Sequence, residues 1–315
     1  MNKADKYFLD TLEEITKKGT WDKNPRPKWK DGSEANSLFI TQKFFKYDIN
    51  KGEFPIITLR PTALKGAFYD IEAIYINQTN IIKEMHPSIH SWWKDFSFES
   101  YGQQSIGQTY GAIIKKYALV DKLLRGLEEN PFGRRHIIDM FQYRDQVIEP
   151  VSLPPCAFNT MWSVREEEYR IYDGGHTSFT CGILDFSKSP SFTPSVIRYI
   201  DLTLIQRSMD YLTVASINPA QYVMLGMMVC NHLTFKTGVK HQLGDFSHFV
   251  QNVHIYNKHL EAAKYLLEEA QTVNEQPTLA LNCEAKDFYD HTIEDFDFNI
   301  PKGIKKFPFK LEIAV

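Results

Sequence analysis

The chain has 315 residues, of which 36 are Lys or Arg and 39 are Asp or Glu, so its formal net charge is −3. That balance disfavours a protein that coats nucleic acid, and an apolar fraction of 43% excludes wholesale disorder. No apolar run is long enough to span a bilayer and the charged N-terminus does not read as a signal peptide, so we expect a cytoplasmic protein without membrane contacts. The cysteines show no zinc-ligand spacing, so we predict no metal; they are Cys156, Cys181, Cys230 and Cys283.

The spacing of apolar residues predicts both helices and strands. In chain order we expect a helix over 8–15, a strand over 38–47, helices over 62–77 and 116–129, strands over 136–141, 157–164 and 197–208, helices over 218–235 and 257–270, and a final strand over 307–315. Several strands follow one another without an intervening helix. We therefore predict an α+β fold, with a mixed β-sheet packed with helices in a single domain over 1–315.

Residues 165–196 separate two of the predicted strands. They contain Gly174-Gly175 and a tract rich in Ser and Pro, and they are far longer than the two to five residues of most hairpin loops. We interpret them as an insertion, either a surface excursion, which we favour, or a segment that borders a cleft.

Three short motifs contain residues suited to catalysis or phosphate binding. Cys156 follows a Pro-Pro pair at the start of a predicted strand, although an isolated Cys is more often a small buried apolar residue. Arg207 and Ser208 end a predicted strand and suit a phosphate, although such an Arg also forms structural ion pairs. The adjacent Arg134 and Arg135 are typical of a solvated surface. None of these motifs is specific alone.

Taken in order, the motifs resemble those of thymidylate synthases, the folate-dependent family with a cysteine nucleophile. The resemblance extends over nearly the whole chain and rests on residues 25–29, 54–60, 107–111, 153–156, 206–210, 218, 254–256, 286–289, 295–296 and 314–315. It implies a methyltransferase of nucleotide biosynthesis that converts dUMP to dTMP with 5,10-methylenetetrahydrofolate as co-substrate, giving dihydrofolate. It also implies a homodimer, formed through a sheet face, with shared active sites.

The resemblance assigns roles to individual residues. The catalytic residues it implies are Cys156 as nucleophile, with Asp70 and Tyr110. The substrate-binding residues are Arg26, Gln206, Arg207, Ser208, Asn218, His254 and Tyr256, joined by Arg134 and Arg135 from the other subunit. The folate-binding residues are Asp210, Trp92 or Trp93, and the terminal carboxylate of Val315. Two of these roles have a simple physical reason: a thiolate is the reactive nucleophile, and an amide both accepts and donates, as the N3–H and O4 of uracil require.

Several positions depart from the family pattern, among them Arg60, Ala157 and Asn252, and two further departures bear on the reaction. Asp70 stands where relatives usually have Glu, on a helical stripe with Ala63, Ala67 and Ile74, whereas Glu72 is expected on the opposite, solvated face. Val214 stands in place of a usual Gly. These departures keep a second enzyme class open, a C5-hydroxymethylase acting on dUMP or dCMP. An RNA-binding regulator, a side role in some relatives, and a non-catalytic homologue are weaker alternatives, because the charge is negative and the key residues are present.

Overall fold

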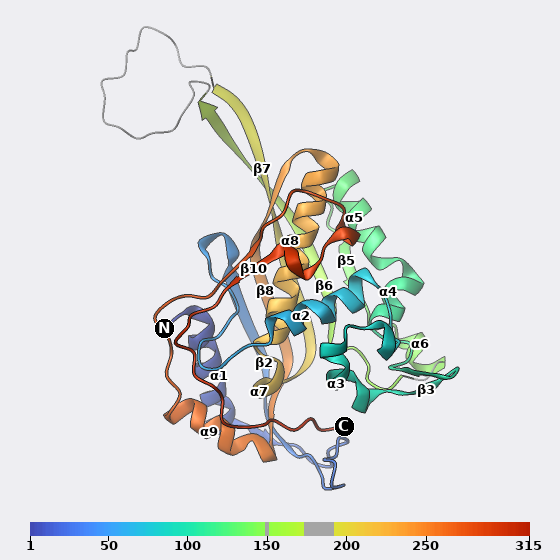
Figure 1. Cartoon of the computed structure of the whole chain (residues 1–315), viewed down its shortest axis with the longest axis vertical. Coiled ribbons are helices and arrows are strands. Elements are labelled where there is room, and N and C mark those ends of the chain that lie inside the picture. The colour runs from blue at the N-terminus through green and yellow to red at the C-terminus, as the bar shows by residue number, and fades with distance from the viewer. Residues whose placement is uncertain (149–150, 173–191) are drawn as a thin grey trace.

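The computed structural model describes residues 1–148, 151–172 and 192–315. Its centre is a six-stranded sheet (Figure 1). The strands lie in the order β1 (Thr20–Trp21), β2 (Ser37–Asp48), β8 (Lys240–Tyr256), β7 (Phe192–Asp210), β6 (Ala157–Tyr172) and β5 (His136–Asp139). Only the pair β7–β8 within it is parallel, so the sheet is mixed. The predicted α+β fold with a mixed sheet is confirmed.

Helices pack against this sheet, and two small two-stranded ladders complete the described fold. The α-helices are α1 (Lys3–Lys18), α2 (Leu64–Ile71), α3 (His90–Trp93), α4 (Gly111–Tyr117), α5 (Leu119–Glu129), α6 (Tyr143–Ile148), α7 (Tyr211–Val214), α8 (Ile217–Thr237) and α9 (Leu260–Glu268). The ladders pair β3 (Phe98–Ser100) with β4 (Gln103–Ser105) and β9 (Thr278–Leu281) with β10 (Phe296–Asn299).

Helix α8 positions much of the pocket described below, because it connects the parallel strands β7 and β8 and packs against β8 (Figure 1). Its residues are apolar almost all round, as predicted for 218–235, and most of them are buried. Gly226 allows the close approach, since a Cβ there would lie 2.7 Å from Cδ1 of Leu243. Within the described residues, no helix is long and apolar enough to cross a membrane. The cytoplasmic location stays a prediction.

The predicted final strand over 307–315 is wrong. This segment has no regular secondary structure, and its alternating residues Phe307, Phe309 and Leu311 line a pocket instead of joining a sheet. Only the chain end makes a strand-like exchange, in which Val315 N donates to Lys28 O and Lys28 N donates to Val315 O. An alternation of apolar and polar residues indicates only that one face of an extended segment is buried. That face can line a ligand pocket as well as pack in a sheet.

The strands that flank the predicted insertion are longer than expected. Residues 165–172 and 192–196 continue β6 and β7 as a two-stranded ribbon that projects from the body (Figure 1). Cross-strand ion pairs join Arg165 to Asp201 and Arg198 to Glu166. Because this exposed ribbon carries charged pairs, it lacks the apolar alternation from which a strand is predicted. The rest of the predicted insertion, 173–191, lies outside the described residues.

The helix predicted over 62–77 is divided into two parts. Helix α2 ends at Ile71, and one π-helical turn follows over Glu72–Ile76. The wider turn places Glu72 half-buried beside His86, and burial raises the pKa of its carboxyl. The expectation that Glu72 is solvated is therefore wrong. Asp70 is buried on the inner face of α2, as its spacing predicted.

Candidate functional site

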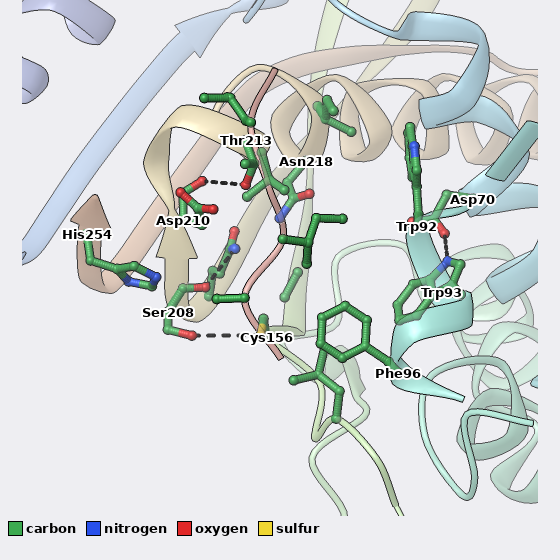
Figure 2. A pocket seen from close by; sticks show the side chains of 18 of the residues that line it. Asp70, Trp92, Trp93, Phe96, Cys156, Ser208, Asp210, Thr213, Asn218 and His254 are labelled. Carbon is green, nitrogen blue, oxygen red and sulfur yellow. Dashed lines mark hydrogen bonds between the residues drawn. The ribbon is translucent and has the colours of Figure 1, made fainter. Parts of the chain in front are cut away.

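The predicted site residues meet in one pocket of about 600 Å³ between the sheet, α2, α8 and the C-terminal segment (Figure 2). Of the residues assigned from the sequence, those that line it are Arg26, Asp70, Trp92, Trp93, Tyr110, Cys156, Gln206, Arg207, Ser208, Asp210, Asn218, His254, Tyr256 and Val315. Arg134 and Arg135 do not line it; both are exposed in the loop between α5 and β5. The fold therefore gathers segments that lie up to 289 residues apart, from Arg26 to Val315.

Cys156 lies half-buried at the start of β6, where the Pro-Pro turn delivers it to the pocket. Its Sγ lies 3.4 Å from Nη2 of Arg207 and 3.7 Å from Oγ of Ser208. Its backbone N–H donates to the hydroxyl of Tyr110 at 3.0 Å. A guanidinium and a hydroxyl therefore both lie within hydrogen-bonding distance of the sulfur.

The guanidinium of Arg207 is held by the turn that precedes Cys156. Its Nε donates to Pro155 O at 2.9 Å and its Nη2 donates to Pro154 O at 2.6 Å. Its backbone N–H donates to Cys156 O at 2.9 Å, which ties β7 to the start of β6. The cation is thus fixed in place before any anion binds, so little conformational entropy is lost on binding.

Two neutral histidines lie along β8. Burial lowers the pKa of His248 to about 3, and its Nε2 contacts Oε1 of Gln206 at 2.9 Å. Gln206 in turn donates to Ser208 O at 2.9 Å, which fixes the end of β7. Burial also lowers the pKa of His254 to about 4, and its Nδ1 contacts Asn252 Oδ1 at 2.9 Å. A neutral ring held at Nδ1 leaves Nε2 as an uncharged polar contact for a ligand.

Asp70 carries a buried carboxyl with two protein donors. Trp93 Nε1 donates to Oδ1 at 2.7 Å (Figure 2), and Gln221 Nε2 donates to Oδ2 at 2.7 Å. Burial raises the pKa of Asp70 to about 6, and these two hydrogen bonds partly oppose that rise. The group therefore changes charge near neutral pH, as proton-transfer groups must.

Asp210 is the second carboxyl of the pocket; the residue is half-buried, but its Oδ1 is buried. Burial raises its pKa to about 7, whereas hydrogen bonds from Thr213 and the positive charge of Arg60 act in the opposite direction. Its Oδ1 and the Nε of Arg60 are buried without a hydrogen-bond partner in the described structure. Arg60 also donates to Leu212 O and lies 5.4 Å from the ring centroid of Phe307. Two orphaned polar atoms in one pocket fit a polar ligand that supplies their partners.

Tyr110 starts α4 in a strained conformation, with φ of +42°. Its hydroxyl accepts from Cys156 N, and its ring meets that of Trp93 edge-on at 5.2 Å between centroids. Positive φ in an aromatic residue is costly, and such strain is retained where the surrounding packing imposes it, often at functional sites.

The sequence did not distinguish Trp92 from Trp93, and the structure gives each a different environment. Trp93 is buried and hydrogen-bonds Asp70. Trp92 lies over α2, where Gly66 makes room, since a Cβ there would lie 2.8 Å from the indole. Phe96 and Phe307 complete an aromatic lining.

Sequence reasoning missed Gln221 and did not assign Arg60 to the site. Gln221 lies one helical turn after Asn218 on α8, so the i, i+3 spacing could have placed both side chains on one face. Arg60 lies in the loop before α2, where no helical or strand periodicity predicts which way a side chain points. Its place near Asp210 is therefore seen only in the folded structure.

A profile of the family described as thymidylate synthase matches residues 6–311. The chain belongs to the thymidylate synthase family. A thymidylate synthase of Lactococcus lactis is 39% identical to it over the full length of both chains. One of Streptococcus thermophilus is 37% identical and aligns over 94% of each chain. The solved structure of thermostable thymidylate synthase A from Bacillus subtilis superposes with a TM-score of 0.76 and 26% identity, over 99% of both chains.

These similarities confirm the predicted family. Thymidylate synthases are methyltransferases, so the predicted enzyme class is confirmed with it, and the hydroxymethylase alternative is not favoured. The pocket geometry of this chain then suggests which of its residues bind and react.

Proposed function

We propose that this protein makes dTMP from dUMP, using 5,10-methylenetetrahydrofolate and releasing dihydrofolate. One observation carries the proposal. The sulfur of Cys156 lies beside Arg207 and Ser208, in a pocket that also presents an amide and two carboxyls. The nucleophile, a phosphate-binding cation and proton-transfer groups are thus within reach of one nucleotide.

Cys156 acts as the nucleophile. Its thiolate adds to C6 of the uracil, and the C5–C6 electron pair moves toward O4, so that C5 becomes able to attack a one-carbon unit. The positive charge of Arg207, 3.4 Å from Sγ, stabilises the thiolate before attack and after release. When the C5 proton has left and the product methyl group is formed, the C–S bond breaks and the thiolate returns.

The nucleotide is held at both ends. Arg26, Arg207 and Ser208 bind the phosphate, since guanidinium forks match phosphate oxygens and a hydroxyl adds a donor. His254 and Tyr256 hold the ribose 3′-hydroxyl from β8. Gln206 fixes the end of β7 from which Arg207 and Ser208 project.

Asn218, on the first turn of α8, reads the base edge. Its amide accepts from N3–H of uracil and donates to O4, a pairing that cytosine does not offer. Asp70 exchanges a proton with water near O4, with its carboxyl aimed by Trp93 and Gln221. Tyr110 helps water to remove the C5 proton.

The remaining pocket residues fit the folate. Asp210 has a buried Oδ1 without a protein partner, which suits the donor N–H groups of a pterin ring, and Trp92 offers an aromatic surface. Methylenetetrahydrofolate would supply both the one-carbon unit and the hydride that reduces it. The terminal carboxylate of Val315, anchored on Lys28, closes the pocket beside the loop of Arg26.

The dimer is part of the proposal. On the sheet face opposite the buried Ile138 and Trp162, Ile137 and Met161 are paired across β5 and β6 and are 47% and 39% exposed. Exposed apolar neighbours on a sheet suit a self-complementary two-fold contact. The exposed Arg134 and Arg135 come directly before β5 at this face, so each subunit can donate them to the phosphate of the other.

Mixing two impaired variants, assayed at dUMP concentrations near the wild-type KM, tests the shared site. Cys156→Ser lacks the nucleophile, and Arg134→Ala/Arg135→Ala should raise KM for dUMP at least about tenfold per lost charged contact. A hybrid dimer has one complete site, so unfolding and refolding the two together should restore activity well above either parent. Hybrids shown to form by mass spectrometry, yet without recovered activity, would contradict phosphate binding across the interface.

Replacing Asn218 by Asp should change base preference. We expect kcat/KM for dUMP to fall at least on the order of a hundredfold, while dCMP turnover appears, because a protonated carboxyl complements cytosine. Competition assays with both nucleotides measure the ratio. A wild-type enzyme that already prefers dCMP would refute the proposed substrate.

Product analysis tests the reaction itself. With dUMP and methylenetetrahydrofolate we expect dTMP and dihydrofolate in equal amounts, by chromatography and by the absorbance of dihydrofolate. Recovery of 5-hydroxymethyl-dUMP with tetrahydrofolate would instead establish the hydroxymethylase.

A further inference from the structure

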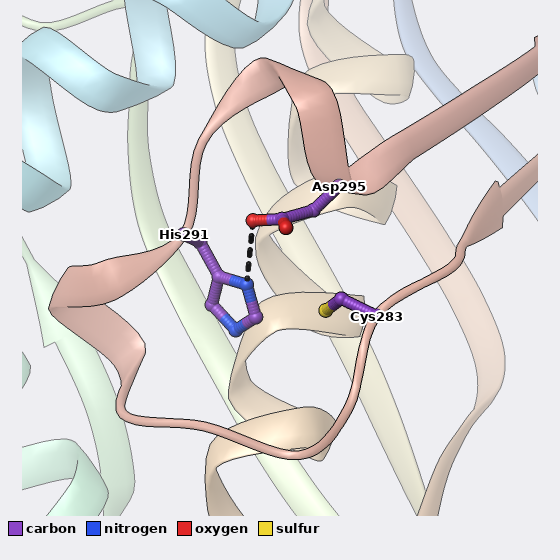
Figure 3. A group of neighbouring side chains, drawn as sticks. All are labelled: Cys283, His291 and Asp295. Atoms are coloured by element: carbon purple, nitrogen blue, oxygen red, sulfur yellow. Dashed lines mark ion pairs between the residues drawn. The ribbon is translucent and has the colours of Figure 1, made fainter.

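A cluster of possible metal ligands lies outside the catalytic pocket, in the connection between β9 and β10 (Figure 3). It consists of Cys283, His291 and Asp295, whose ligand atoms all lie within 4.8 Å of one another. None of the three lines the catalytic pocket. Their spacing of eight and four residues matches none of the zinc motifs that sequence reasoning sought.

The fold brings these three residues together at the base of a loop. The ladder β9–β10 ends with Leu281 opposite Phe296, and Asn282 N donates to Asp295 O at 2.7 Å. Cys283 and Asp295 therefore flank the point at which the ladder opens. His291 lies four residues before Asp295 and points back toward it (Figure 3).

His291 is the observation that indicates a missing partner. Its side chain is completely buried, and neither ring nitrogen has a hydrogen bond in the described structure. Oδ2 of Asp295 lies 3.5 Å from Nδ1 of the ring, which is too far for a good hydrogen bond. Each ring nitrogen of this buried side chain is therefore unsatisfied, at a cost that a ligand could remove.

The donor set identifies the class of ligand. Thiolate, imidazole and carboxylate together suit zinc, with water as the fourth ligand. We propose that Cys283, His291 and Asp295 bind a zinc ion that ties the β9–β10 loop together. The Cys283 thiol releases one proton on binding, and the thiolate and carboxylate then balance the two positive charges. Zinc holds its ligand atoms about 3.3–3.8 Å apart, so the cluster contracts by about 1 Å.

The ammonium group of Lys286 pairs with the carboxylate of Asp295 and must move away before zinc can bind there. Its Nζ lies 2.6 Å from Oδ2 of Asp295, but its side chain is 29% exposed and can turn into solvent. Asn231 of α8 holds the loop at two points. Its Oδ1 accepts from Lys286 N at 2.9 Å, and its Nδ2 lies 3.8 Å from Cys283 Sγ. The backbone can therefore stay in place while the ammonium leaves.

Titration with cobalt, then zinc, tests the site in untagged, chelator-treated protein. Cobalt should give a stoichiometric thiolate charge-transfer band, and zinc should abolish the band and raise Tm. Cys283→Ser should remove the band and lower affinity by more than the 10–100-fold that losing an outer-shell partner costs. Cys156→Ser is the matched control and should keep the band.

Lys286→Met keeps the test decisive if Cys283→Ser fails to fold. Removing the competing charge should tighten cobalt binding at least about fivefold. Absence of a band in wild type, a band that follows Cys156 instead of Cys283, or unchanged affinity in Lys286→Met would each overturn the proposal.

Discussion

Replacing Cys156 by Ser should reduce turnover on the order of 10⁴-fold or more, the size of effect seen when a covalent nucleophile is removed. A serine hydroxyl beside Arg207 remains protonated at neutral pH and has no general base among its described contacts. The 5-fluoro analogue of dUMP, with methylenetetrahydrofolate, should form a covalent complex with wild type and none with the variant. Mass spectrometry of the intact protein detects the adduct.

The variant should still fold and bind dUMP. Cys156 is half-buried, and the change from sulfur to oxygen leaves the contact of its backbone N–H with Tyr110 in place. Calorimetry should therefore show a nearly unchanged Tm and a dUMP affinity within a few-fold of wild type. Retained turnover in the folded variant would refute the nucleophile assignment.

Asp70→Asn should lower kcat by about 10²–10⁴-fold, the range for loss of a proton-transfer group, with little change in dUMP affinity. Asn also removes the acid limb of the pH profile. Burial places the pKa of Asp70 near 6, so wild-type activity should fall as pH drops through that value. Asp70→Glu keeps a carboxyl and should retain most activity.

The same substitution should lower activity but stabilise the folded protein at neutral pH. Because the folded pKa of Asp70 is raised above the unfolded value of 3.8, this group stabilises the fold fully below about pH 4, and that contribution is lost as pH rises through about 6. Asn is never ionised, and Gln221 can turn its amide so that its oxygen accepts. Asp70→Asn should therefore exceed wild type in stability by up to about 3 kcal/mol above pH 7, with no difference near pH 4.

Gln221→Met separates positioning from chemistry. Loss of the 2.7 Å hydrogen bond to Asp70 should raise the carboxyl pKa further and move the acid limb of kcat/KM upward, while activity at high pH stays close to wild type. Activity that falls equally at every pH would mean that Gln221 supports only the packing. A wild-type profile with no limb near pH 6, together with full activity of Asp70→Asn, would exclude proton transfer by Asp70.

The spacing of apolar residues predicted most helices and strands, because the residues that one element buries recur at its own structural period. The alternation around Ile200, Leu202 and Leu204 is matched by their burial in β7, and the apolar run over 218–235 is helix α8. The same logic misassigned residues 307–315, because a pocket and a sheet bury alternate residues alike. It misplaced the β6–β7 ribbon, because exposed strands carry charges rather than an apolar face.

The α+β class, the family resemblance and the candidate side chains could be predicted from the sequence, since motif order and residue chemistry are properties of the chain. Which of these side chains meet depends on the folded structure. In the folded chain Arg60 lies near Asp210, and both Gln221 and Trp93 donate hydrogen bonds to Asp70, whereas Trp92 does not. Arg134 and Arg135 lie outside the pocket. The physical reason is that hydrogen bonds, burial and pKa shifts depend on distances between segments far apart in the chain, which local periodicity does not encode.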